Sequence, residues 1–119
     1  MTTRYLSLPF LFLTLFLTTA CRHDSRTDLI LNQADSLLAT RPDSALHLME
    51  RHADRLPPRS TQECARYALL LARALDKCEQ SLEPCDSLLD VALACYDSRS
   101  PERATALLYK ARLEVEMDC

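Results

Sequence analysis

The sequence predicts an all-α protein in which stacked antiparallel helix hairpins, five helices in total, follow an N-terminal signal peptide. Apolar residues recur at spacings of three and four beyond residue 26, and serine or proline stands where several of these stretches begin. The sequence contains no alternating apolar and polar run bounded by turn residues. We therefore divide the chain into a signal peptide (residues 1–20), a short tether (21–26) and a helical domain (27–119).

Glycine is absent from all 119 residues. Phosphate-binding loops, dinucleotide-binding turns and the elbow that exposes a serine nucleophile all need glycine, because the backbone there approaches a ligand or takes a positive φ. The net charge of −3 also argues against a nucleic-acid-binding surface. The composition thus excludes whole enzyme classes, whereas helices lose only their preferred C-terminal cap.

The N-terminus combines the parts of an export signal. Arg4 provides a positive start, residues 6–17 form an apolar run, and residues 18–21 form a lipobox that ends in Cys21. The run is shorter than the roughly 20 residues of a permanent membrane helix, which favours a cleaved signal. The segment resembles a bacterial lipoprotein signal peptide. The resemblance implies lipidation of Cys21 and anchoring to a bacterial membrane, on the periplasmic or outer-membrane face. The alternative is an ordinary secretory signal in which Cys21 is incidental.

The first predicted hairpin contains two helices. The first helix begins near Ser25 and ends at about Ala39, with helical spacing of Ile30, Ala34, Leu37 and Leu38. The second helix begins at Pro42, which suits the first position because its missing donor costs nothing there. It is expected to run to about Leu56, before two prolines. Its inward stripe comprises Ala45, Leu46, Met49, Ala53 and Leu56.

The third predicted helix is the one around which the others are expected to pack. A capping box from Ser60 to Glu63 starts it, and it extends from Gln62 to Lys77. One apolar stripe comprises Cys64, Ala68, Leu71, Leu75 and Cys78. Further apolar residues cover most of the circumference and leave a polar strip of Gln62, Arg66, Arg73 and Lys77. A helix of this kind has neighbours on most sides.

Two more helices complete the predicted domain. Pro84 opens the fourth, whose main stripe comprises Cys85, Leu88, Leu89, Ala92, Cys95 and Tyr96. Ser100 caps the fifth and Pro101 takes its first position. The apolar stripe of this last helix comprises Ala104, Leu107, Leu108, Ala111 and Val115.

Four stretches carry a resemblance to a known family: residues 34–38, 41–46, 65–70 and 104–117. With hairpins that begin near positions 25, 60 and 101, the sequence resembles the tetratricopeptide-repeat lipoproteins of Gram-negative bacteria, whose period is about 34 residues. The resemblance implies a fragment of an α-solenoid. Longer members continue through further hairpins, and some are similar to membrane-spanning sensors. This chain stops after the first helix of a third hairpin, so a truncated reading frame is an alternative expectation.

The cysteines after Cys21 are candidates for pairing, because an exported protein lies where disulfides persist. In an antiparallel hairpin that turns between the third and fourth helices, Cys64 is expected near Cys95, and Cys78 near Cys85. Either pair could be oxidised if its Cα atoms lie within about 7 Å. The alternative is that these residues are small buried apolar side chains on helix stripes.

No motif in the sequence predicts catalysis, a cofactor or a metal site. His47 and His52 are five residues apart and share a helix face poorly, and no C-x-x-C pair is present. Two carboxylate pairs, Glu50 with Asp54 and Asp86 with Asp90, lie one turn apart, which is also the spacing of an ordinary solvated helix face. We expect a protein that is not an enzyme.

Two functional hypotheses remain. The first is a membrane-anchored module that binds an unidentified protein or peptide without catalysis. The second is a scaffold or sensor remnant that supplies the N-terminal capping hairpins of a larger repeat protein and has no ligand of its own. The exposure of the last predicted helix bears on these hypotheses. If Leu107, Leu108, Ala111 and Val115 stay exposed, the chain is expected to need a partner or to self-associate there.

Overall fold

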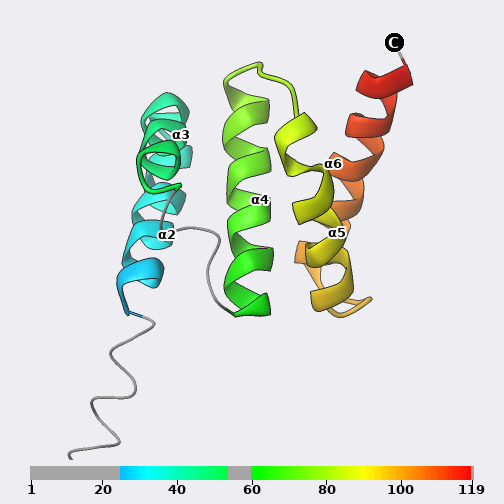
Figure 1. The fold of residues 1–119 in the computed structure, drawn as a ribbon, viewed down its shortest axis with the longest axis horizontal. Helices are drawn as coiled ribbons and strands as arrows, with labels where there is room; N and C mark the ends of the chain where they lie inside the picture. The colour runs from blue at the N-terminus through cyan, green and yellow to red at the C-terminus, as the bar shows by residue number, and fades with distance from the viewer. Residues whose placement is uncertain (1–24, 54–59, 119) are drawn as a thin grey trace, which may run out of the picture.

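A computed structural model describes residues 25–53 and 60–118, and these residues form α-helices with no strand among them. Five α-helices and one short 3-10 helix are seen in these ranges (Figure 1). In chain order they are α2 (Ser25–Leu38), α3 (Pro42–Arg51), α4 (Thr61–Lys77), η2 (Glu83–Cys85), α5 (Asp86–Cys95) and α6 (Pro101–Asp118). The prediction of an all-α protein is confirmed for this part of the chain.

Helix α4 lies in the middle of the arrangement, with α2 and α3 on one side and α5 and α6 on the other (Figure 1). It contacts all four of these helices. Nine of its 17 residues are buried. A helix with apolar residues around most of its circumference can bury them only between neighbours, so this central position follows directly from the sequence of α4.

The first helices of successive hairpins run parallel to one another. On the α2–α4 side, Asn32 contacts Arg66 and Leu38 contacts Lys77, so the partner positions rise together along both helices. The connector after α4 contacts α6 through Glu116. The hydrogen bonds on both sides join residues 34 to 39 positions apart in the sequence. The same offset therefore relates α2 to α4 and the end of α4 to α6.

Both ends of α4 are capped by local interactions. At the start, the Glu63 amide donates to the Ser60 hydroxyl over 3.1 Å, as the predicted capping box requires. At the end, Glu79 takes a φ of 58°, and the Gln80 amide donates to the Leu75 carbonyl over 2.9 Å. This is the position that glycine prefers. Because the chain has no glycine, a glutamate adopts the left-handed conformation, at a cost of about 1–2 kcal/mol.

Helix α3 is shorter than predicted. It ends at Arg51, the residue Ala53 lies in a turn and is exposed, and the predicted end at Leu56 lies outside the described residues. The Ala53 amide donates to the Glu50 carbonyl, three residues back, which tightens the last turn. The predicted inward position of Ala53 is therefore wrong. Met49 is the last buried residue of this helix.

The fourth predicted helix also begins differently. Pro84 lies in the 3-10 turn η2, and the α-helix starts two residues later at Asp86. Leu82 and Cys85 are both buried, and the Cys85 amide donates to the Leu82 carbonyl over 2.8 Å. In a 3-10 turn, side chains three residues apart lie above one another, so this geometry directs both side chains into the core.

Candidate functional site

The predicted interaction face of α6 is exposed. We name it the α6 face; it consists of Leu107, Leu108, Ala111 and Val115. The exposed fractions are 50% for Leu107, 58% for Leu108 and 66% for Val115, and Ala111 is also exposed. The core is reached instead by Ala106, Tyr109 and Leu113, on the opposite side of the helix. Helix α6 therefore has two apolar faces, of which one is buried.

The exposure of the α6 face contrasts with the matching side of α4. Arg112 and Asp76 form an ion pair at 2.5 Å, which sets α6 level with α4 at a separation of 36 residues. At that separation, Ala104, Leu107, Leu108 and Ala111 correspond to Ala68, Leu71, Ala72 and Leu75 of α4. All four of those α4 residues are buried. The α6 face thus corresponds to a surface of α4 that is covered by the helices packed on α4.

A second apolar surface lies on the first hairpin. We name it the α2–α3 groove; it has a volume of about 520 Å³ and is lined by Leu29, Asn32, Gln33, Ser36, Leu37 and Leu48. Among the described residues, no charged side chain lines it, and Leu29 is 59% exposed. The buried residues Leu31 and Ala34 lie on the other side of α2. The groove-bearing hairpin and α6 lie at opposite ends of the helix stack (Figure 1).

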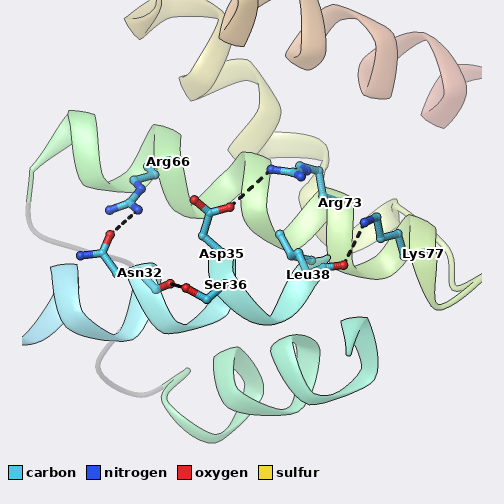
Figure 2. Close-up of polar contacts among 7 residues, drawn as sticks. All are labelled: Asn32, Asp35, Ser36, Leu38, Arg66, Arg73 and Lys77. Atoms are coloured by element: carbon cyan, nitrogen blue, oxygen red, sulfur yellow. Dashed lines mark hydrogen bonds and ion pairs between the residues drawn. The ribbon is translucent and has the colours of Figure 1, made fainter. Parts of the chain in front are cut away.

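Polar contacts set the register between α2 and α4 (Figure 2). The Arg66 guanidinium donates to the Asn32 side-chain oxygen over 2.6 Å, and Arg73 lies 3.6 Å from Asp35. The Lys77 ammonium donates over 2.8 Å to the carbonyl of Leu38, the last residue of α2, where a cation also suits the helix dipole. These partners are partly exposed, so each ion pair contributes at most about 1 kcal/mol. Their role is alignment of the two helices.

The four cysteines of the described helices and connectors are free thiols. Burial raises the pKa of Cys64, and the nearby charge of Cys95 raises it further. Burial raises the pKa of Cys85 to about 12, which keeps this thiol protonated and unreactive. Cys78 is half-buried at the end of α4. Oxidation of either pair stays a prediction.

The predicted carboxylate pair of α5 is engaged by a lysine. The Lys110 ammonium lies 2.6 Å from Asp86 and 2.9 Å from Asp90, and its hydrogen bond to Asp86 raises its pKa most, followed by that to Asp90. This arrangement links α6 to α5 and offsets one of the two negative charges. The other predicted pair is only half described, because Asp54 lies outside the described residues.

One cleft brings together side chains that the sequence could not place. It measures about 550 Å³ between α3 and the end of α4, and its lining includes His47, Glu50 and Cys78. Within the described residues, no hydrogen bond joins the imidazole to the thiol, so the arrangement lacks the contact of an activated nucleophile. The same part of the chain holds no cluster of three or more potential metal ligands.

Comparison with known proteins found no relative of this chain. No protein-family model, curated protein or solved structure matches this chain.

The remaining sequence predictions concern the membrane. Cys21 and the signal peptide lie outside the described residues. Among the helices that the structure describes, none has the length and apolarity needed to span a bilayer.

The sequence signal that could have revealed the α2–α3 groove is weak. Leu29 stands one position before the predicted stripe of α2 and looks like an isolated exposed leucine. Only packing of α3 places Leu48 beside it.

Proposed function

We propose that this protein is a membrane-anchored helical-repeat module that binds another protein outside the cytoplasm and does not catalyse a reaction. The observation that carries the proposal is the α6 face. Leu107, Leu108 and Val115 are three of the large apolar side chains exposed in the described residues, and they lie on one stripe of one helix. Contiguous exposed apolar surface of this kind is typical of a site that a partner covers.

The parallel order of α2, α4 and α6 supports the repeat interpretation. A tetratricopeptide repeat places one helical hairpin every 34 residues. The hydrogen bonds from α2 to α4, and from the connector after α4 to α6, span 34 to 39 residues, which agrees with that period plus short insertions. A repeat stack exposes the apolar face of its end helix unless a cap or a partner covers it.

The second candidate is a set of capping hairpins from a larger repeat protein. It is favoured by the correspondence between the α6 face and buried residues of α4, because a following hairpin would cover the α6 face in the same way. Under this alternative, the occupant is an intramolecular helix, and the isolated chain has no ligand of its own.

Site-specific photo-crosslinking in native membranes tests the binding proposal. A photoreactive residue at position 108 or 115 is expected to give discrete protein adducts. The control is position 87, since Ser87 is exposed on α5 and is not part of the α6 face. Adducts at 108 and 115 that are absent at 87 would support a partner on the α6 face. The same pattern at all three positions, or no adduct at any, would contradict it.

Membrane anchoring is expected to depend on Cys21. The Cys21→Ala variant removes the thiol that is predicted to carry the acyl chains, so the protein is expected to move from the membrane fraction to the soluble fraction. Fractionation of cells that express each form, followed by immunoblotting, measures the change. Cys95→Ala is the matched control because it removes a thiol within the helical domain. Unchanged fractionation of Cys21→Ala would show that Cys21 is not the anchor.

A further inference from the structure

We propose that the α6 face of one copy binds the α2–α3 groove of a second copy, so that the protein assembles head to tail. This inference rests on the proposed function and names the partner of the α6 face. Its starting point is that α6 has an exposed apolar stripe and the α2–α3 hairpin has an apolar groove. The two elements lie at opposite ends of the helix stack (Figure 1).

The two surfaces have complementary shapes. Leu107, Leu108 and Val115 project from a single helix and form a ridge. The α2–α3 groove, of about 520 Å³, lies on a helix pair and has Leu29, Leu37 and Leu48 among its lining residues. Packing of helices commonly places a ridge of one element into a groove of its neighbour. Docking would cover the exposed leucines of both surfaces in one step.

Charges of opposite sign that lack an ion-pair partner in the described residues stand beside the two surfaces. Glu114 and Asp118 are exposed next to the α6 face. Arg26 is exposed one turn before Leu29 on α2, and Arg51 lines a pocket with Leu37 and Leu48. Within the described residues, none of these four charges has an ion-pair partner. One acid, Asp43, lines the same pocket as Arg51, so the positive charge there is partly offset.

The order of these charges repeats a pattern already present inside the chain. Between α2 and α4, the acids are on the earlier helix, where Asp35 pairs with Arg73. Between α4 and α6, Asp76 of the earlier helix pairs with Arg112 of the later one. A joint in which Glu114 and Asp118 of α6 meet Arg26 of the next copy would likewise place the acids on the earlier helix and the base on the later one. Because Glu114 and Asp118 lie at the C-terminal end of α6 and Arg26 at the N-terminal end of α2, the two helices would be antiparallel in this joint. Head-to-tail docking thus keeps the charge polarity of the internal contacts, but not their parallel helix direction.

The size of the contact favours a hairpin over a second α6 as the occupant. Stable specific interfaces bury about 1,200–2,000 Å² in total. Two α6 helices packed on each other would join a single helix to a single helix and leave both α2–α3 grooves exposed. Docking on the hairpin joins α6 to two helices at once, as α4 is joined to α2 and α3 within the chain. Such an interface uses different surfaces on the two copies and can extend beyond a dimer.

A mixing experiment tests this assembly. The variants are Leu108→Glu, which blocks the α6 face, and Leu29→Glu, which blocks the groove; both leucines are exposed, so the fold should be retained. The mature protein is purified in detergent and studied by analytical ultracentrifugation. We expect the unmodified protein to form species that grow with concentration beyond the dimer. Each variant alone should be monomeric, because its affinity for a second copy of itself should be lower than that of the unmodified protein by about tenfold or more. The mixture of the two should form a heterodimer and nothing larger.

Each other outcome overturns the head-to-tail arrangement. Dimers of Leu29→Glu alone would indicate that two α6 faces pack on each other. An unmodified protein that stays monomeric at the highest concentration reached would exclude self-assembly. If the unmodified protein stays monomeric while position 108 still crosslinks to a different protein in membranes, the proposed function stands and only this inference fails. As a second measurement, Glu114→Arg should weaken assembly and Arg26→Glu on the other copy should restore it.

Discussion

Replacing Leu113 by alanine is expected to lower the free energy of unfolding by about 2–4 kcal/mol, whereas Leu108→Ala on the same helix should change it by less than about 0.5 kcal/mol. Leu113 is 1% exposed and packs in the core, so its truncation removes buried apolar surface and leaves a cavity. Leu108 is more than half exposed, so little burial is lost there. Urea denaturation followed by circular dichroism at 222 nm measures both changes.

This pair of substitutions is matched, because the residue type, the replacement and the helix are the same. Helix propensity therefore cancels, and the difference reports only which side of α6 faces the core. Equal effects of the two substitutions, or a larger effect of Leu108→Ala, would mean that α6 is rotated relative to the structure. The α6 face would then be part of the core, and both the proposed partner site and the head-to-tail joint would be lost.

Alkaline pH is expected to destabilise the protein through Cys85. Burial raises the pKa of this thiol from 9.0 to about 12 in the folded protein. Between these values the unfolded chain loses the proton and the folded protein keeps it, so the unfolded state binds fewer protons. Stability should therefore fall as pH rises above 9, by about 1.4 kcal/mol per pH unit. Below pH 9 both states are protonated, and the contribution of Cys85 is constant.

The measurement is the free energy of unfolding between pH 8 and 10.5, in excess reductant, for the unmodified protein and for Cys85→Ala. The variant loses core contacts at every pH, but its stability should fall less steeply above pH 9. Cys64 and Lys110 also have raised pKa values and act in the same direction, so the relevant quantity is the difference between the two slopes. Parallel curves would show that the Cys85 thiol ionises normally in the folded protein and is not buried.

The positions of the helices could be predicted where the signals are local. Ser60 accepts a hydrogen bond from the Glu63 amide as the capping box requires, and Pro42 and Pro101 begin α3 and α6. A cap or a proline acts on the backbone within one turn, so its effect can be predicted from a few adjacent residues. The end of α3 could not be predicted in this way, because it depends on whether Ala53 finds a neighbour to pack against.

The candidate site was predicted only in part. The stripe of Leu107, Leu108, Ala111 and Val115 is evident from its spacing, and the structure leaves it exposed. The α2–α3 groove was missed, because it forms only when Leu48 of α3 lies beside Leu29 and Leu37 of α2. No spacing within a single helix encodes a surface that two helices share.

The sequence by itself determined that these residues form helices, where most of the helices begin, and that α4 must lie between others. The tertiary structure decided which of the two apolar faces of α6 is buried, which side chains Lys110 bridges, and which surfaces stay open at the two ends of the stack. The physical reason is that periodicity specifies the faces of one helix. When a helix has two apolar faces, the choice between them depends on burial against residues distant in the sequence, which only the packed chain supplies.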